Sequence, residues 1–371
     1  MISNFIKSIS IWIFLGVTTI TGGQAQNQNS DDRKYIGADS LGIGGRQAHS
    51  GPSFHRIDTS RYPDLPPNPK LFYTHSAGMY ISFRTNSSSI YAKWCTSSAK
   101  AYMNMTGIAF EGLDLYIKKD GAWVYAGVGR LGTGDCNEHT LVTAMEEGVW
   151  KECLLYLPLY DAISSLEIGV NTDAKIHPLE NKPFNKQIPI YGTSIVQGAS
   201  ASRPGLAYPA RMSRLLGHDF INLGISGSAK MEPEVAHMIA NMELDGLILD
   251  CIPNCSPDNI SDRTASFIQI IRKKHPQIPI IAMEGAAFES GNFNRIIADD
   301  MEERNRRWNI EINLLKKSDP NLYLIESEGL MGDDHEGTID GTHPNDLGFD
   351  RMLNKMVPAT KNILDQYTFY K

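Results

Sequence analysis

The chain has 371 residues, 42% of them hydrophobic and 21% charged, with a formal net charge of −7. This composition is typical of a folded protein and excludes a fibrous or low-complexity chain. The acidic balance, without a run of lysine or arginine, gives no reason to expect a nucleic-acid partner. The length favours two domains, each with its own core.

The first 25 residues have the pattern of a secretory signal peptide. Lys7 precedes an apolar run over residues 9–20, and Gly23 and Ala25 fit the small-residue positions before a cleavage site. The run is too short for a transmembrane helix, although an N-terminal helix of the fold is an alternative. We therefore expect a secreted or periplasmic protein without membrane insertion.

Five cysteines follow, at positions 95, 136, 153, 251 and 255. An oxidising compartment permits disulfides, but five thiols in a long chain do not form a disulfide framework. Cys251 and Cys255 could pair if the residues between them loop out, yet we expect mostly buried free thiols. No second Cys/His pair lies at ligand spacing, so no zinc site is expected.

Residues 26–183 are predicted to form an antiparallel β-sandwich. Residues 26–75 are rich in Gly, Pro, Ser, Asn and Asp, which indicates an irregular lead-in. Short alternating runs then indicate half-buried strands, and Lys119-Asp120-Gly121 is typical of a hairpin turn. The expected strands are 79–84, 90–94, 113–117, 123–127, 140–144, 152–157 and 166–170.

Residues 184–371 show a different pattern, in which strands alternate with helices. The expected strands are 188–192, 220–223, 246–250, 278–283 and 322–325, and the expected helices are 208–216, 233–242, 262–274, 299–317 and 346–363. Alternation of this kind predicts βαβ units around a parallel sheet. In such sheets, chemistry collects in loops beyond the carboxyl ends of the strands.

One of these loops carries a candidate nucleophile, Ser194. It follows the strand 188–192 among small neighbours that leave its hydroxyl exposed. A serine hydroxyl is a weak nucleophile unless a base removes its proton. Taken alone, a serine at such a position is an ordinary turn residue.

The last loop supplies a base and a carboxylate, His343 and Asp340. They are three residues apart and separated by Gly341, so a turn can point both side chains the same way. A carboxylate on one imidazole nitrogen leaves the other nitrogen free for a serine. The alternative is that Asp340 caps the final helix and His343 lies at the surface.

Two intervening loops offer donors for an oxyanion. Gly224 permits close approach of a backbone amide, and Asn254 offers a side-chain amide. Serine, glycine, asparagine and Asp-x-x-His thus follow four strands in chain order. Over residues 186–366 this resembles the GDSL-type or SGNH hydrolases.

The resemblance implies a serine esterase with a flavodoxin-like three-layer α/β/α domain and no cofactor or metal. It makes Ser194 the nucleophile, Asp340 and His343 its triad partners, and Ser194, Gly224 and Asn254 the oxyanion hole. The residue before the serine departs from the family motif, since Thr193 stands where aspartate is usual. That aspartate is not a triad member, so the change weakens the motif match more than it threatens the mechanism.

A second resemblance lies in the N-terminal region. Gly112-Leu113-Asp114-Leu115-Tyr116 is similar to the Gly-x-Asp-Leu-Tyr signature of a β-rich domain preceding some bacterial hydrolases of this type. The likeness implies a bacterial protein whose sandwich packs against the hydrolase and helps to shape its cleft. From the residues alone, Leu113 and Leu115 lie on one strand face, with Asp114 and Tyr116 on the other.

Other residues admit two interpretations. Residues 333–336 could bind a metal but are more typical of a solvated acidic loop, and Arg203 could meet an acidic or sugar-borne substrate group or form a structural salt bridge. Trp94, Trp123 and Trp150 could form a sugar-stacking platform, although tryptophans in sandwiches are usually core.

The leading functional hypothesis is hydrolysis of an ester. A carbohydrate O-acetyl group is preferred because of the predicted secretion, the two-domain layout and the likeness to bacterial polysaccharide-associated hydrolases. A lipid esterase, lysophospholipase or thioesterase uses the same chemistry and is an alternative. A non-catalytic glycan-binding protein is a second alternative. The expected partner is an acylated small molecule or polysaccharide, and the sequence leaves the oligomeric state open.

Overall fold

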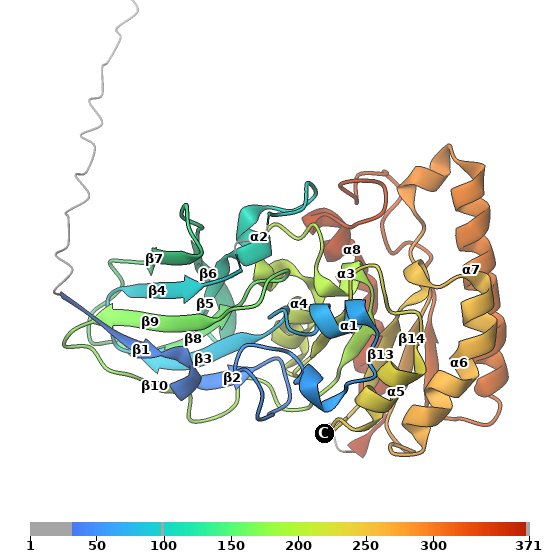
Figure 1. Ribbon diagram of the computed structural model, residues 1–371, viewed down its shortest axis with the longest axis horizontal. Coiled ribbons are helices and arrows are strands. Elements are labelled where there is room, and N and C mark those ends of the chain that lie inside the picture. Colours follow the sequence, from blue (N-terminus) through green and yellow to red (C-terminus); the bar gives the residue numbers. More distant parts are fainter. Residues whose placement is uncertain (1–31, 98–99, 369–371) are drawn as a thin grey trace, which may run out of the picture. The chain divides into compact units, whose positions relative to one another are not determined.

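A computed structural model describes residues 32–97 and 100–368 of the chain. The predicted signal peptide lies outside these residues. The described part contains two antiparallel sheets followed by a parallel sheet with helices, so the predicted fold class is confirmed (Figure 1). No helix in the described ranges is both long and apolar enough to cross a membrane.

The antiparallel sheets have the strand orders β1-β9-β4-β7 and β10-β3-β8-β5-β6, with β2 paired to β3. Apolar side chains such as Phe83, Trp94, Leu115 and Leu155 are buried together in one core cluster. The strands are β1 (Arg33–Gly37), β2 (Gly42–Gly44), β3 (Tyr80–Thr85), β4 (Ile90–Cys95), β5 (Leu113–Lys119), β6 (Ala122–Gly129), β7 (Cys136–Val142), β8 (Lys151–Tyr156), β9 (Ser165–Asn171) and β10 (Ile176–Pro178).

The lead-in is more ordered than predicted. Strand β1 pairs with β9, β2 pairs with β3, and the helix α1 (Pro67–Phe72) follows them. The short helix α2 (Gly107–Glu111) was also missed. These elements are too short for hydrophobic periodicity to show, and long-range pairing stabilises the two strands.

The parallel sheet has the order β12-β11-β13-β14-β15, and every neighbouring pair is parallel. This is the flavodoxin-like order, in which the first strand lies between the second and the third. The strands are β11 (Ile190–Gly192), β12 (Asn222–Gly224), β13 (Leu247–Asp250), β14 (Ile280–Met283) and β15 (Leu322–Ile325). All five agree with the predicted strands to within a few residues.

The helices fall into two groups, as right-handed crossovers in this order require. Helix α4 packs against α8, whereas α6 packs against both α5 and α7. Their bounds are α3 (Ser194–Gln197), α4 (Tyr208–Leu216), α5 (Pro233–Ala240), α6 (Pro257–Arg272), α7 (Arg295–Leu315) and α8 (Asp346–Leu364). Helix α6 begins five residues before the predicted start because Ser256, its N-cap, forms a capping box with Asn259 in its first turn.

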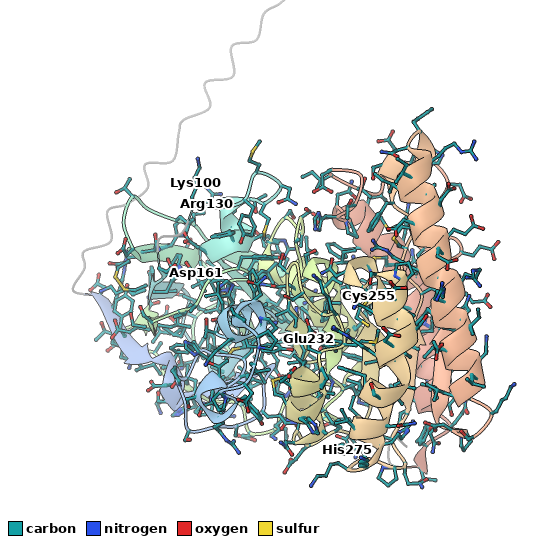
Figure 2. The ribbon with its side chains drawn as sticks, turned by 45° about the vertical axis from the view of Figure 1, so that its right-hand side comes forward. Lys100, Arg130, Asp161, Glu232, Cys255 and His275 are labelled. Atoms are coloured by element: carbon teal, nitrogen blue, oxygen red, sulfur yellow. A yellow bond between two sulfur atoms is a disulfide. The ribbon has the colours of Figure 1, made fainter. Side chains whose placement is uncertain are left out.

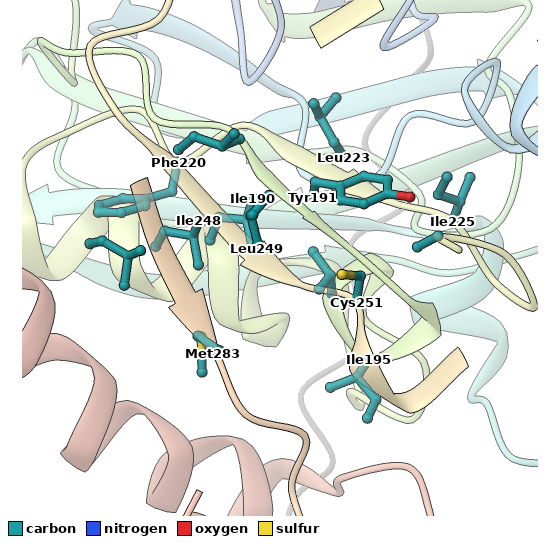
Figure 3. Close-up of a cluster of buried hydrophobic side chains, with 14 of the residues drawn as sticks. Ile190, Tyr191, Ile195, Phe220, Leu223, Ile225, Ile248, Leu249, Cys251 and Met283 are labelled. Carbon is teal, nitrogen blue, oxygen red and sulfur yellow. The ribbon is translucent and has the colours of Figure 1, made fainter. Parts of the chain in front are cut away.

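Strands β11, β12, β13 and β14 of the parallel sheet are buried along their whole length, which explains their continuous apolar runs, whereas the edge strand β15 is partly exposed. Ile190, Tyr191, Leu223, Ile248 and Leu249 are at most 1% exposed. Figure 3 shows these side chains in the buried cluster around the sheet.

One of the contacts between the sandwich and the parallel-sheet region is a small, mainly aromatic cluster. Tyr80, Tyr116 and Tyr156 from the sandwich pack with Phe184 and Ala210. By their contacts, residues from Arg33 onward form one unit. A domain boundary near residue 184 therefore stays a prediction.

Candidate active site

Ser194 lies at the position in the parallel sheet where the strand order reverses. It is the first residue of α3, directly after β11, and β11 lies between β12 and β13. Ligands bind outside the carboxyl ends of such strands. Thr193 caps α3, because its Oγ1 accepts the Ile195 N–H at 3.3 Å. The threonine thus performs a capping role for which aspartate is equally suited.

The three predicted triad residues are linked by hydrogen bonds. Ser194 Oγ lies 2.8 Å from His343 Nε2, and His343 Nδ1 lies 2.8 Å from Asp340 Oδ2. Ser194 is 8% exposed, so the residue is buried more deeply than the sequence predicted. A serine, an imidazole and a carboxylate in this order can transfer the serine proton to the imidazole.

The loop that carries Asp340 and His343 is a closed turn. Thr338 and Pro344 form a β-bridge across it, and the Ile339 N–H donates to the His343 carbonyl at 3.0 Å. Gly341 has φ +84°, a conformation that favours glycine. Asn345 caps α8 by accepting the Gly348 N–H, so the alternative that Asp340 caps this helix is wrong.

Asp340 is held in its ionised form. Partial burial raises the pKa of Asp340, but hydrogen bonds from the His343 N–H, the His343 ring and the Thr342 N–H outweigh burial and leave the pKa below its ordinary value. The carboxylate is therefore charged at neutral pH and can stabilise an imidazolium.

Gly224 does not fit its predicted role as an oxyanion donor. Its N–H already donates to Asn222 Oδ1 at 2.9 Å. A Cβ at this position would lie 2.1 Å from the backbone nitrogen of Gln197 in α3. Glycine is thus required here because the end of β12 touches the backbone of α3.

A different glycine of the same loop has a free amide. Gly227 has φ +66°, and no group in the described parts of the chain accepts its N–H. The neighbouring Ser226 N–H donates to Gln197 Oε1 at 3.0 Å, which holds this loop beside α3. Gly227 was visible in the sequence as a second glycine of the same loop. Gly224 was chosen as the donor because it lies nearer the end of the strand.

Asn254 and the Ser194 amide also remain as candidate donors. Asn254 Nδ2 donates one hydrogen to the Ser228 carbonyl at 2.6 Å, and its second hydrogen remains available. The Ser194 N–H has no acceptor within residues 32–97 and 100–368. Asn254 ends the short η5 (Ile252–Asn254) that follows β13.

Arg203 forms a structural ion pair. Its Nη1 lies 2.8 and 2.7 Å from the two carboxylate oxygens of Asp114, and 2.7 Å from the Tyr116 hydroxyl. Asp114 also accepts the Gly205 N–H at 2.8 Å. The Asp and Tyr of the Gly-x-Asp-Leu-Tyr segment therefore attach the sandwich to the segment after α3.

The remaining candidates are engaged elsewhere. Asp334 pairs with Arg351, His335 pairs with Glu289, and the described residues hold no group of three or more potential metal-ligating acids, histidines or cysteines. Trp94 is buried in the sandwich core, while Trp150 is 45% exposed beside Arg84, so the two do not form one platform.

The disulfide is not the Cys251–Cys255 pair that the sequence suggested. Cys95 and Cys136 form a disulfide, whereas Cys153, Cys251 and Cys255 are buried free thiols. Cys255 lies in the parallel-sheet region, away from the sandwich (Figure 2).

Two further residues near this site had no signal in the sequence. Asn104 Nδ2 lies 3.0 Å from Asp340 Oδ2, although 236 residues separate them. Arg56 is 1% exposed and donates to the carbonyls of Asn222 and Gly224 at 3.0 and 2.8 Å. Both contacts join the N-terminal region to loops at the strand ends.

The parallel sheet and the Ser194–His343–Asp340 arrangement define a class, the α/β serine hydrolases. Within this class, residues 185–361 match the GDSL-like lipase/acylhydrolase family, and residues 33–176 match the domain found at the N-terminus of SGNH-type esterases. A GDSL-like lipase from Bacteroides ovatus is 51% identical, covers 90% of this chain and 98% of its own, and superposes with a TM-score of 0.87. The chain therefore belongs to the GDSL-like lipase/acylhydrolase family.

Two more distant structures share the fold. A salicylyl-acyltransferase from a tetracycline biosynthetic pathway is 17% identical over 90% of this chain and 97% of its own, with a TM-score of 0.69. An acetyl xylan esterase from Butyrivibrio proteoclasticus is 14% identical over 90% of this chain and 99% of its own, with a TM-score of 0.55. No curated protein is significantly similar in sequence.

Proposed function

We propose that this protein is an exported serine esterase that removes O-acetyl groups from carbohydrates through Ser194. The observation that carries the proposal is the hydrogen-bonded series from Ser194 Oγ through His343 to Asp340, with both contacts at 2.8 Å. It lies where a parallel sheet of this order binds its ligands.

The chemistry follows from this geometry. His343 Nε2 takes the Ser194 proton as Oγ attacks the ester carbonyl, and a tetrahedral intermediate forms with a negative oxygen. When the C–O bond to the sugar breaks, His343 returns the proton to the departing alcohol and Ser194 keeps the acyl group. Water then attacks the acyl-enzyme by the same route and releases the acid and free Ser194.

In this proposal the intermediate's oxygen accepts hydrogen bonds from the Ser194 amide, the Gly227 amide and the Asn254 side chain. Gly227 replaces Gly224 because the Gly224 N–H is already donated to Asn222. Donors that are fixed before the reaction stabilise developing charge without reorganisation.

Two findings favour a carbohydrate ester and an exported protein. The acetyl xylan esterase with the same fold over 90% of this chain removes acetyl groups from a polysaccharide. The Cys95–Cys136 disulfide is a bond typical of oxidising compartments, which agrees with the predicted signal peptide.

The first test compares the mature protein with Ser194→Ala on 4-nitrophenyl acetate. We expect kcat/KM to fall by at least roughly 1,000-fold, because no other group can take over the nucleophile's role. Ser266→Ala, an exposed serine on α6, is the matched control and should leave the rate unchanged. Equal turnover by Ser194→Ala would remove Ser194 from the mechanism.

The second test measures acyl and alcohol specificity. We expect acetyl esters to be cleaved faster than eight-carbon or longer acyl esters, and acetate to be released from an acetylated polysaccharide such as xylan. Preference for long acyl chains would favour a lipid esterase or thioesterase instead. Binding of glycans without cleavage of any ester would favour the non-catalytic alternative.

A further inference from the structure

Asn104, in the sandwich, contacts the proposed catalytic residues directly. Its Nδ2 lies 3.0 Å from Asp340 Oδ2 and 3.4 Å from His343 Nδ1. Oδ2 is the same carboxylate oxygen that faces the His343 ring at 2.8 Å. One side-chain amide therefore touches the junction between the two residues on which the proton transfer depends.

The segment that carries Asn104 is fixed at its beginning. Cys95, the last residue of β4, is bonded to Cys136, and Ser97 donates from its N–H and its hydroxyl to Asp161 Oδ2 at 3.1 and 2.8 Å. Asp161 is 3% exposed and lies on the sandwich side of the protein (Figure 2).

The segment is also fixed around and after Asn104. The Tyr102 ring packs edge-on against Phe110 and Tyr160, with ring centroids 5.4 and 5.5 Å apart. Thr106 caps α2, and its hydroxyl donates to the Ser202 carbonyl at 2.7 Å. Asn104 is therefore held close to the triad by the surrounding contacts and does not depend on its own hydrogen bond for its position.

The four donors around Asp340 divide between its two oxygens. Oδ1 accepts the backbone N–H groups of Thr342 and His343, and Oδ2 faces the His343 ring and the Asn104 amide. A carboxylate with both oxygens engaged has little freedom to rotate away from the ring. Orienting partners of this kind commonly decide how well a histidine is aligned.

We propose that Asn104 is a positioning residue that holds the Asp340 carboxylate against His343, so that the sandwich completes the active site. This inference rests on the proposed function of Ser194, Asp340 and His343. It assigns the N-terminal region a part in orienting Asp340 and His343, beyond packing against the hydrolase.

The charged groups around this loop have partners of their own. Asp346, at the start of α8, accepts the Ser202 N–H at 2.9 Å. Ser290, which donates to the Gly341 carbonyl, is next to Glu289, and Glu289 pairs with His335 at 2.8 Å. Asn104 itself is neutral, so Asn104→Asp replaces the donor to Asp340 Oδ2 by a second carboxyl group, which repels the Asp340 carboxylate and adds negative charge beside His343.

The test is the pH dependence of kcat/KM for Asn104→Asp, which has nearly the same shape as the wild-type side chain. A second carboxylate beside the ring favours the imidazolium, and only the neutral ring can accept the Ser194 proton. We expect the acid limb of the profile to move to higher pH by roughly one unit. The control is Asn362→Asp, which lies roughly 24 Å along α8 from Asp346 and adds the same charge without the contact.

Asn104→Ala supplies the second readout. We expect kcat to fall about tenfold with KM changed less than threefold, because the residue acts through Asp340 and not on the substrate. The inference is overturned if the Asn104→Asp profile superimposes on that of the wild type, or if Asn104→Ala retains wild-type kcat. A rise in KM alone would make Asn104 a substrate contact and would also overturn it.

Failure of the inference can be separated from failure of the proposed function. If the wild-type protein cleaves no ester, the proposed function fails, and NMR titration of the His343 ring still tests the contact. The ring should then protonate at higher pH in Asn104→Asp than in the wild type. If the wild type is active and Ser194→Ala is not, an unchanged Asn104→Asp profile counts against the role of Asn104 alone.

Discussion

At the scale of single residues, two glycines three positions apart have different tasks. Gly224 is required by packing, since a Cβ there would meet the backbone of α3, and its amide is bound to Asn222. Gly227 has no such neighbour and a positive φ, and its N–H has no acceptor among the described residues. A pattern of residue types cannot separate a glycine needed for close approach from one needed for its N–H group.

Asn254 provides a prediction at this scale. Asn254→Ala should lower kcat on 4-nitrophenyl acetate by roughly 100-fold to 1,000-fold, the effect of losing one oxyanion donor. The melting temperature should change little, because the side chain makes one other hydrogen bond, to the Ser228 carbonyl. Asn362→Ala, at the exposed end of α8, serves as the control. A kcat within threefold of wild type would exclude Asn254 from the oxyanion hole.

At the scale of elements, strand ends are fixed by groups that belong to other parts of the chain. Arg56 holds the carbonyls at both ends of β12, and Asp219, just before β12, accepts the Gly45 N–H of the lead-in at 3.3 Å. Arg56 is 1% and Asp219 7% exposed. Burial of Arg56 is tolerated because backbone carbonyls accept its hydrogens, whereas Oδ1 of Asp219 is buried without a hydrogen-bond partner in the described part of the chain.

Asp219 gives a pH-dependent prediction. Burial raises the pKa of Asp219 from 3.8 to about 7, so the folded state binds its proton more tightly than the unfolded state does. The contribution of protonated Asp219 to the free energy of unfolding is therefore present in acid and is lost as the pH rises from about 4 to about 7. Asp219→Asn keeps an acceptor for Gly45 and removes the charge. In denaturant unfolding at pH 8, the free energy of unfolding of the variant should exceed that of the wild type by at most about 4 kcal/mol. At pH 4 the two proteins should have the same free energy of unfolding.

The control for this prediction is Asp173→Asn, an exposed residue in the turn after β9. It should leave the pH dependence of unfolding as in the wild type. Parallel stability curves for Asp219→Asn and wild type between pH 4 and pH 8 would contradict the prediction.

At the scale of the whole molecule, the sandwich is fastened to the hydrolase part near the nucleophile. In the Asp114–Arg203 pair, the Asp114 side chain is fully buried. The Arg203 guanidinium stacks over the Tyr125 ring, 4.3 Å from its centroid. Arg214 stacks over the Tyr116 ring at 4.0 Å. Ser202, the residue before Arg203, accepts a hydrogen bond from the Thr106 hydroxyl, two residues after Asn104. The contacts between the sandwich and the hydrolase part therefore extend to the active site.

The Asp114–Arg203 pair gives a prediction at this scale. Arg203→Met should lower the free energy of unfolding by about 3 kcal/mol, because it leaves the buried Asp114 carboxylate without its ion-pair partner. Asp114→Asn together with Arg203→Met should be less destabilising than the sum of the two single changes, since the charge is then absent as well. Urea unfolding of the four proteins measures this coupling. Additive losses would show that the pair has no energetic connection.

Several features of this protein follow from the sequence alone. Alternating and continuous apolar runs fixed the order and type of most strands and helices, because side-chain periodicity is a local property of each element. Ser194, Asp340 and His343 were predicted together because each follows a strand of one parallel sheet, and such strand ends meet at one edge. The hydrogen bonds among them agree with that expectation, whereas their catalytic roles remain proposals.

Other features were decided only by the tertiary structure. The Cys95–Cys136 disulfide exists because β4 and β7 pair with these two residues opposite one another, and their 41-residue separation follows no pattern. The same holds for Arg56 and Asn104, which are ordinary residues in irregular segments. Their partners are distant in sequence, so their position depends on how the sandwich packs against the hydrolase part. Non-local contacts of this kind leave no periodicity in a single sequence, and they determine which amides are free and which carboxylates are held.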